Sequence, residues 1–89
     1  MVEREFEIIN RLGLHARAAA KLVTMASSFA SDIQVSREAQ SVNGKSIMGV
    51  MLLAASQGTT IRIRAEGKDE ERALEELGAL IARRFDEAE

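Results

Sequence analysis

The spacing of apolar residues in this chain alternates between two residues, typical of strands, and three to four, typical of helices. Strand-like segments are predicted at residues 2–9, at Ile33–Val35, in a brief stretch that ends near Val42, and at Thr60–Ala65. Helical segments are predicted from Ala16 to about Phe29, from Ile47 to Ala55, and after Asp69. The order is βαββαβα, which builds an α+β fold with an antiparallel sheet and helices on one face.

Opposite charges line the outward sides of the first and last strands. Glutamates occupy outward positions 3, 5 and 7, whereas Phe6 and Ile8 face inward together with Arg4, which fits that side poorly. Arg62 and Arg64 occupy outward positions of the last strand. Because opposite charges on facing strands are stabilising, we expect the two strands to be neighbours in a split βαβ arrangement.

Local signals predict where the helices begin and end. Ser46 is a suitable N-cap for the second helix, and Gly58 is a candidate for its C-terminal stop. Asp69 is a suitable N-cap for the last helix, with acidic residues 70 and 71 at the positive end of its dipole. Arg83 and Arg84 suit the negative end. Its apolar stripe consists of Ala73, Leu74, Leu77, Leu80, Ile81 and Phe85.

Length and composition limit the classes of function. The 89 residues fit a single domain, residues 1–89, without room for an internal catalytic cavity. The absence of cysteine and the single histidine predict no disulfide, no metal site and no cofactor of that kind. A net charge of −2 and only three aromatic residues, all phenylalanine, speak against nucleic-acid binding. The apolar runs are too short to span a membrane and the N-terminus does not resemble a signal peptide, so we expect a cytoplasmic protein.

The single histidine, His15, lies where the chain leaves a loop and the first helix begins. The backbone N–H groups of Ala16 and Arg17 have no partner within a helix and could meet a phosphate there. The Arg17 guanidinium could hold phosphate oxygens, and imidazole is a nucleophile near neutral pH. The alanines at 16, 18, 19 and 20 leave the approach open. On this spacing alone, an ordinary surface histidine beside a solvated arginine remains the more common case.

The apolar run after Ser46 has two interpretations. A helix on a small sheet buries one stripe, so Ile47, Met48 and Met51 would form an exposed docking patch. Alternatively, the helix lies deeper in the fold and the patch does not exist. Phosphorylation of Ser46 would add negative charge at the helix N-terminus, which the dipole tolerates, so its effect would fall on partners.

Two segments resemble the HPr family, the histidine-containing phosphocarriers of the bacterial sugar phosphotransferase system. Gly13-Leu14-His15-Ala16-Arg17 resembles its active-site signature, and Val42-Asn43-Gly44-Lys45-Ser46-Ile47-Met48-Gly49-Val50-Met51 resembles its regulatory serine region. The resemblance extends in register over essentially the whole chain. It implies an open-faced β-sandwich, with a four-stranded antiparallel sheet and three helices on one face, and a carrier rather than an enzyme.

The resemblance also implies roles for individual residues. His15 would accept a phosphoryl group from phospho-enzyme I on Nδ1, as a pros-phosphohistidine, and donate it to an enzyme IIA domain. Arg17, with the Ala16 amide, would stabilise the bound phosphate. Ser46 would be the target of an HPr kinase/phosphorylase. The partner-binding face would comprise Leu14, Ala20, Ile47, Met48 and Met51.

One position departs from the family pattern. Ala18 stands where the family usually has proline. Proline has no backbone N–H, so the alanine restores a donor in the first helical turn. The departure leaves open a nitrogen-type phosphorelay carrier, and a regulatory paralogue acting through Ser46 is a further alternative. Topology alone would also suit a ferredoxin-like ligand-binding module. A carrier whose docking face stays open is expected to be a monomer.

Overall fold

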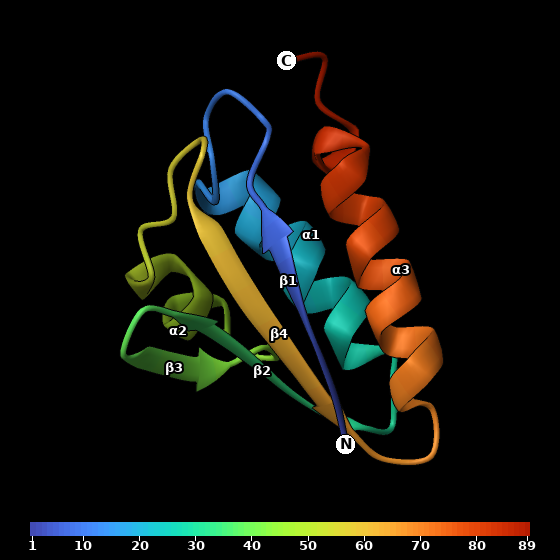
Figure 1. Ribbon diagram of the computed structural model, residues 1–89. Helices are drawn as coiled ribbons and strands as arrows, with labels where there is room; N and C mark the ends of the chain where they lie inside the picture. The colour runs from blue at the N-terminus through green and yellow to red at the C-terminus, as the bar shows by residue number, and fades with distance from the viewer.

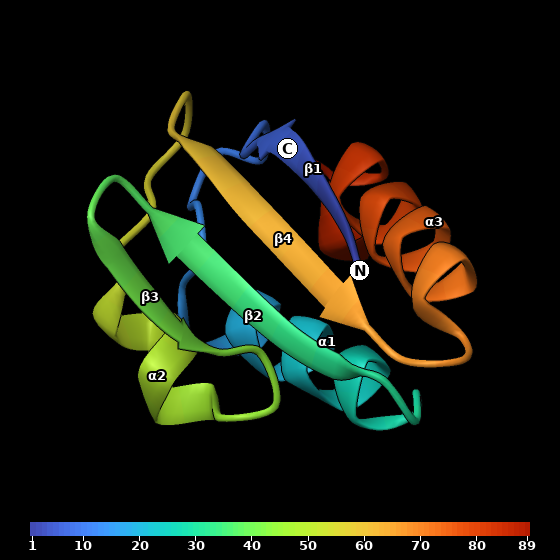
Figure 2. The ribbon, with the colours of Figure 1, turned by 60° about the horizontal axis from the view of Figure 1, so that its bottom comes forward.

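The computed structural model describes residues 1–89 and confirms the predicted βαββαβα order. The strands are β1 (Val2–Glu7), β2 (Asp32–Arg37), β3 (Gln40–Asn43) and β4 (Thr60–Glu66). The helices are α1 (Ala16–Ser27), α2 (Ile47–Leu52) and α3 (Glu70–Ala82), followed by a short 3₁₀ turn, η1 (Arg84–Asp86). The helices lie on one side of the sheet, and its other side is open, as Figure 2 shows. The fold is therefore the expected open-faced α+β sandwich.

The four strands form one antiparallel sheet in the order β1-β4-β2-β3. Glu3 stands opposite Arg64 and Glu5 opposite Arg62, so the neighbours predicted from charge are confirmed. The Arg64 Nε lies 3.3 Å from the Glu3 carboxylate. Strands β1 and β4 are thus brought together although most of the chain separates them in sequence (Figure 1).

A single core fills the space between the sheet and the helices. Helix α1 and helix α3 lie side by side across the sheet, and α2 covers the end near β3 (Figures 1 and 2). The inward residues of β4, Ile61, Ile63 and Ala65, are fully buried, as are Leu22 of α1 and Leu77 of α3. The predicted inward face of the last strand and the stripe of the last helix are therefore confirmed.

The first strand and first helix are each two residues shorter than predicted. Strand β1 ends at Glu7, because Ile8 already pairs with the turn before β4, through its N–H to the Thr59 carbonyl and its carbonyl to the Gly58 N–H. Helix α1 ends at Ser27, where Ser28 adopts the C-cap position. Arg4 is exposed, because β1 lies at the edge of the sheet.

Helix α2 ends at Leu52, three residues earlier than predicted, and Gly58 is not its stop. Ala54 has a left-handed backbone, with φ of +49°, which ends the helical path. The Arg37 guanidinium closes the helix from across the fold, donating to the carbonyls of Leu53 at 2.9 Å and Ala54 at 3.2 Å. Gly58, with φ of +89°, instead forms the turn that leads into β4.

The ends of α3 also differ from expectation. Asp69 occupies the N-cap position, but its carboxylate makes no capping hydrogen bond and binds the segment between α1 and β2 instead. The acidic pair Glu70 and Glu71 does lie in the first turn. At the other end the helix stops at Ala82, and Phe85 reaches the core from η1 with a φ of +54°. Arg83 is the C-cap and Arg84 lies beyond the helix, so neither lies within its last turn.

Candidate functional site

The loop after β1 positions His15 through contacts within itself and with the segment after α2. The buried Asn10 donates from its side-chain Nδ2 to the Gly13 carbonyl at 2.8 Å. The backbone carbonyl of Asn10 accepts from the Gly13 N–H. Gly13 has φ of +66°, which glycine adopts without strain. The Leu14 N–H then donates to the Ala55 carbonyl at 2.8 Å. The loop therefore delivers His15 to the start of α1 in a fixed position.

His15 is the N-cap residue of α1, which confirms that it lies where the loop ends and the first helix begins. Its backbone is extended, with φ of −72° and ψ of 176°, and its carbonyl accepts the first helical hydrogen bond, from the Ala19 N–H at 2.8 Å. The N–H groups of Ala16, Arg17 and Ala18 make no hydrogen bond. These unpaired donors follow His15 at the positive end of the helix dipole. Ala16 is exposed, but Ala18 and Ala19 are fully buried in the core, so the expectation that all of these alanines leave the approach open is wrong for these two.

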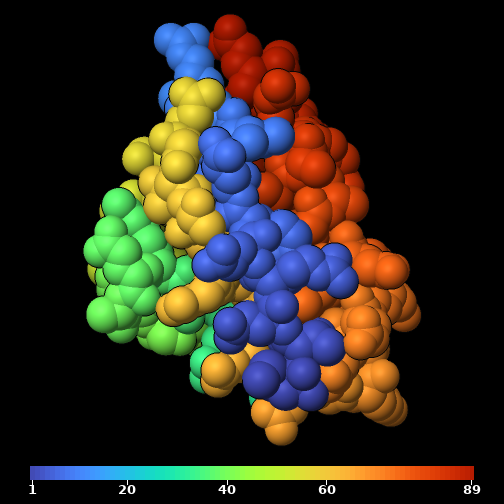
Figure 3. Space-filling model, viewed as in Figure 1, coloured from blue at the N-terminus to red at the C-terminus, as the bar shows by residue number.

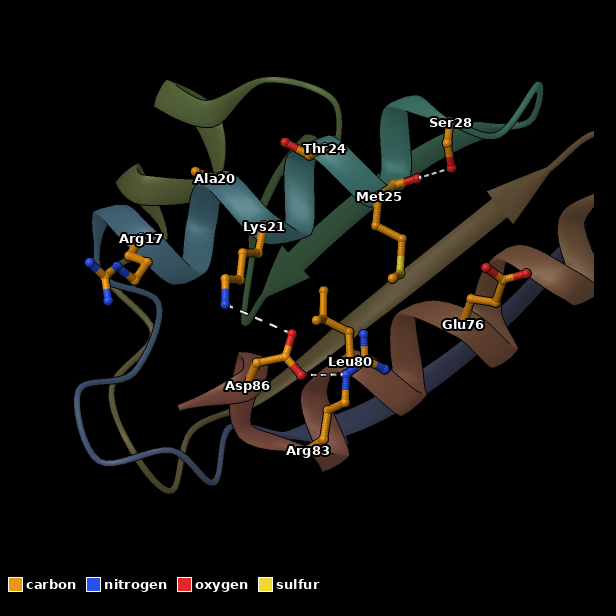
Figure 4. Close-up of a pocket in the computed structure, with 10 residues that line it drawn as sticks. All are labelled: Arg17, Ala20, Lys21, Thr24, Met25, Ser28, Glu76, Leu80, Arg83 and Asp86. Atoms are coloured by element: carbon orange, nitrogen blue, oxygen red, sulfur yellow. Dashed lines mark hydrogen bonds and ion pairs between the residues drawn. The ribbon is translucent and has the colours of Figure 1, made fainter. Parts of the chain in front are cut away.

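Arg17 contributes an uncommitted positive charge beside His15. Its side chain is exposed and forms no ion pair, and it lines one hollow together with His15 and Ala16. A second groove, between α1 and α3, runs from Arg17 past Lys21, as Figure 4 shows. Asp86 lies between two of the cations of this groove: 3.8 Å from Lys21 Nζ and 2.8 Å from Arg83 Nε. Arg17 is therefore free to bind an anion.

The C-terminal residues form part of the site, which the sequence did not indicate. Glu87 contacts His15 Nε2 through one carboxylate oxygen and accepts from Asn10 Nδ2 at 3.0 Å through the other. Arg11 binds Glu89 through its backbone N–H and its guanidinium, each at 2.9 Å. Figure 3 shows the last residues beside the loop after β1. Glu87 lies 72 residues after His15, and no sequence motif relates the two positions. Only the tertiary structure reveals this contact.

The pKa of Glu87 reflects these surroundings. Burial by itself would raise the pKa of this carboxyl, but the hydrogen bonds from His15 and Asn10, with the charges of His15 and Lys21, lower it. The net result is a pKa below the usual glutamate value. Glu87 is therefore a carboxylate at neutral pH.

Ser46 caps α2, as predicted. Its Oγ accepts from the Gly49 N–H at 3.2 Å, and its carbonyl accepts from the Val50 N–H at 3.0 Å. The Asn43 side chain accepts from the Lys45 N–H at 2.9 Å and so supports the turn before the helix. The half-buried Ser46 side chain thus lies at the junction of turn and helix.

The apolar patch on α2 exists, which decides between the two interpretations of this run. Ile47 is 40% exposed, Met48 75% and Met51 43%, and the only buried residue of the helix is Val50. Leu52, at 68%, and Leu12 in the loop before His15, at 66%, are two exposed leucines that the sequence analysis did not single out. The deeper burial considered for α2 is wrong, because the helix covers the end of the sheet with one side only.

The residues predicted for a partner-binding face do not all reach the surface. Leu14 is buried and packs in the core, so it supports the loop from beneath and offers no contact surface. Ala20 is half-buried on α1, and α1 packs against α2. The structure thus places His15, the start of α1 and the α2 patch on neighbouring elements.

No group of three or more His, Cys, Asp or Glu side chains is arranged to hold a metal ion. None of the helices has the length and apolar character needed to cross a membrane.

Comparison with known proteins places this geometry in context. Residues 2–83 match the family model described as "PTS HPr component phosphorylation site". The phosphocarrier protein HPr of Xylella fastidiosa (strain Temecula1) is 55% identical over 87 residues, 98% of each chain, and that of Cupriavidus necator is 52% identical over the full length of both. A crystal structure of an HPr from Thermoanaerobacter tengcongensis superposes with a TM-score of 0.96 at 48% identity, covering both chains completely. The HPr-like protein Crh of Bacillus subtilis is 44% identical over 91% of this chain and 95% of its own.

Proposed function

Because this chain belongs to the HPr family, the phosphocarriers of the phosphotransferase system, we propose that His15 is the residue that carries the phosphoryl group. It accepts the group on Nδ1 from phospho-enzyme I and passes it to enzyme IIA domains. The protein is a carrier and not an enzyme, so each transfer is completed with groups that the partner supplies. Both steps take place in the cytoplasm.

The observation that carries this proposal is the pairing of His15 with unpaired phosphate-binding groups. The unpaired N–H groups of the exposed Ala16 and Arg17 follow it, and the Arg17 guanidinium beside it has no acidic partner. Anions bind readily at such a helix start, and arginine can bind two phosphate oxygens at once. The donors on the surface are those of Ala16 and Arg17, because Ala18 is fully buried.

The transfer is a displacement at phosphorus. The lone pair of Nδ1 forms the new N–P bond while the bond between phosphorus and the donor group breaks, and the donor keeps that electron pair. In the second step the His15 N–P bond breaks and the acceptor histidine of the IIA domain forms its own. The free amides and Arg17 stabilise the phosphate charge in both directions, which is the main task of a phosphoryl-transfer site.

The exposed patch on α2 provides a surface for the partners. Ile47, Met48 and Met51 lie on an element that packs against α1, and methionine side chains adapt to different partner shapes. Enzyme I and the IIA domains therefore bind the same face in turn. This face must stay open, so the working form is a monomer, although one solved HPr from Thermoanaerobacter tengcongensis is described as a dimer.

Phosphorylation of Ser46 by an HPr kinase/phosphorylase would control this face. The added phosphate would stand beside Ile47 and Met48 and place negative charge at the edge of the docking patch. A partner that binds this patch would then bind more weakly, without any unfolding of α2. The similarity to Crh, named as a catabolite repression HPr in its solved structure, supports a regulatory use of Ser46 as a second role.

The proposal is tested by incubating the protein with enzyme I, phosphoenolpyruvate and magnesium. The wild type should gain one acid-labile phosphate in intact-mass spectra, whereas His15→Ala should gain none. Arg17→Ala should be phosphorylated more slowly, because it keeps the nucleophile and loses one phosphate contact. A wild type without phosphate, or a phosphorylated His15→Ala variant, would contradict the proposal.

The role of Ser46 requires a separate comparison. Ser46→Asp should accept phosphate from enzyme I more slowly than wild type, and Ser46→Ala should accept it at the wild-type rate. Transfer to IIA domains of the sugar branch and of the nitrogen-type branch, measured side by side, distinguishes the two relays. Equal rates for Ser46→Asp and wild type would contradict the regulatory role.

A further inference from the structure

Glu87 contacts the carrier histidine on the ring nitrogen that phosphoryl transfer does not use. We propose that Glu87 is a positioning residue: it holds the ring proton on Nε2 and so leaves the lone pair on Nδ1. The inference rests on the proposed function of His15 and adds to it the reason why this nitrogen, and not the other, attacks.

The carboxylate of Glu87 is itself held in place. One of its oxygens accepts from Asn10 Nδ2 at 3.0 Å, and the same nitrogen donates to the Gly13 carbonyl at 2.8 Å. Asn10 is completely buried, and it joins the loop to the C-terminal segment through these two hydrogen bonds. The other carboxylate oxygen meets His15 Nε2. The side chain of Glu87 is 15% exposed, so water competes little for this contact.

The charge on Glu87 determines which tautomer this contact favours. A glutamate carboxyl is ionised at neutral pH, and the hydrogen bond from Asn10 favours this charged form, so the group is an acceptor only. Nε2 must therefore donate its proton to the carboxylate, since a lone pair there would face another lone pair. In the neutral ring the second nitrogen, Nδ1, is then without a proton.

The same contact assists the transfer step. When Nδ1 forms the bond to phosphorus, the ring becomes positively charged, and the proton on Nε2 stays in its hydrogen bond with Glu87. The carboxylate stabilises that charge, as the buried aspartate does for the histidine of a catalytic triad. The reverse transfer restores the neutral ring with the same tautomer, so no proton has to be exchanged with water in either direction.

The other charged groups around His15 do not replace Glu87. Arg11 and Glu89 pair with each other, and Asp86 pairs with Arg83 and lies near Lys21. Arg17 forms no ion pair with an acidic side chain. Glu87 is therefore the single acidic side chain in contact with the imidazole.

The first test is the tautomer of His15, read from the ¹⁵N chemical shifts of the two ring nitrogens at a pH where the ring is neutral. The wild type should show a protonated Nε2 and an unprotonated Nδ1. Glu87→Ala should show a mixture of tautomers. Glu89→Ala is the matched control. It removes an acidic side chain of the same segment, but that side chain binds Arg11 and not His15. It should keep the wild-type signals.

The second test is the rate of phosphorylation by limiting enzyme I and phosphoenolpyruvate. At metal sites, loss of the group that orients a ligating histidine costs about 10- to 100-fold, and Glu87→Ala should be slower by a factor of that order. Glu87→Gln has one acceptor oxygen for two donors, Asn10 Nδ2 and His15 Nε2, so it should also lose the tautomer preference and recover little of the rate.

The two tests separate this inference from the proposed function. If wild type accepts phosphate on His15 but Glu87→Ala matches it in both tautomer and rate, the positioning role is wrong. A slower Glu87→Ala variant with an unchanged tautomer also overturns it, because the loss would then be structural. If wild type accepts no phosphate, the proposed function fails, and the ¹⁵N shifts alone still decide whether Glu87 fixes the tautomer.

Discussion

The carboxylate of Asp69 binds Ser31, 38 residues earlier in the chain, although Asp69 occupies the N-cap position of α3. Its two oxygens accept from the N–H groups of Ala30 at 2.8 Å and Ser31 at 2.9 Å, and from the Ser31 hydroxyl. The residue therefore joins the end of α1 to the start of α3. The Glu70 carboxylate accepts from the Gly67 N–H at 3.1 Å and so links the first turn of α3 to the turn before it.

This contact should make stability depend on pH. The hydrogen bond from the Ser31 hydroxyl, with those from the backbone, lowers the pKa of Asp69 from 3.8 to about 2. A lowered pKa means that the contribution to stability is present above the unfolded-state value and is lost as pH falls toward the folded-state value. The difference in unfolding free energy between wild type and Asp69→Asn should therefore be constant at neutral pH and shrink between 3.8 and about 2.

Urea denaturation at a series of pH values measures this difference. In a Ser31→Ala background the pH dependence attached to Asp69 should be smaller, because the strongest of its hydrogen bonds is absent. A difference that stays the same down to about pH 2 would show that Asp69 does not titrate as described.

Gly13 should be intolerant of a side chain. A Cβ there would lie 2.5 Å from the Ala55 carbonyl oxygen and 2.8 Å from the Ser56 Cα, and its φ is +66°. Backbone strain of this kind costs about 1–3 kcal/mol, and the clash with backbone atoms adds to it. Gly13→Ala should therefore lower the unfolding free energy by about 2 kcal/mol or more in chemical denaturation.

Gly58 provides the matched control for this prediction. Its φ is +89°, but a Cβ there would meet nothing within 4 Å. Gly58→Ala should therefore cost only about 1 kcal/mol, from the backbone conformation alone. Equal losses for the two variants would mean that close contact with Ala55 and Ser56 does not matter.

The opposite charges that face each other on β1 and β4, on the open side of the sheet, should stabilise the protein. Arg64→Glu would place two acids directly opposite each other, at positions 3 and 64, and should destabilise the protein by about 0.5–1 kcal/mol. Both side chains are largely exposed, so the loss should diminish at high salt. The double variant Glu3→Arg/Arg64→Glu should recover most of it in thermal denaturation. If the double variant were no more stable than Arg64→Glu, the loss would come from the change at Arg64 and not from its pairing with Glu3.

Ser46 should matter for stability as well as for regulation. Ser46→Ala removes the acceptor for the Gly49 N–H and should cost about 1 kcal/mol of unfolding free energy. Ser46→Asp should cost less, because a carboxylate can accept the same hydrogen bond and suits the helix dipole. A Ser46→Ala variant as stable as wild type would show that this cap is not needed for α2.

The order of elements could be read from the sequence because each signal is local. Alternation in residues 60–65 and helical spacing in α3 depend only on which side chains face the core. Even the pairing of β1 with β4 was predictable, because charges at positions 3, 5, 62 and 64 mark outward faces that must meet. Element ends were less predictable: Arg37 closes α2 from another strand, and no local signal contains that contact.

His15, its helix start and the Ser46 cap were determined by the sequence, since each depends on neighbours within a few residues. The tertiary structure alone decided that Glu87 meets His15, that Asp69 binds Ser31 and that Leu14 is buried. These contacts join residues far apart in the chain, and their geometry follows from how α1, α3 and the C-terminal segment pack together. The residues next to a carboxylate in the sequence do not indicate which distant residue it will contact in the folded protein.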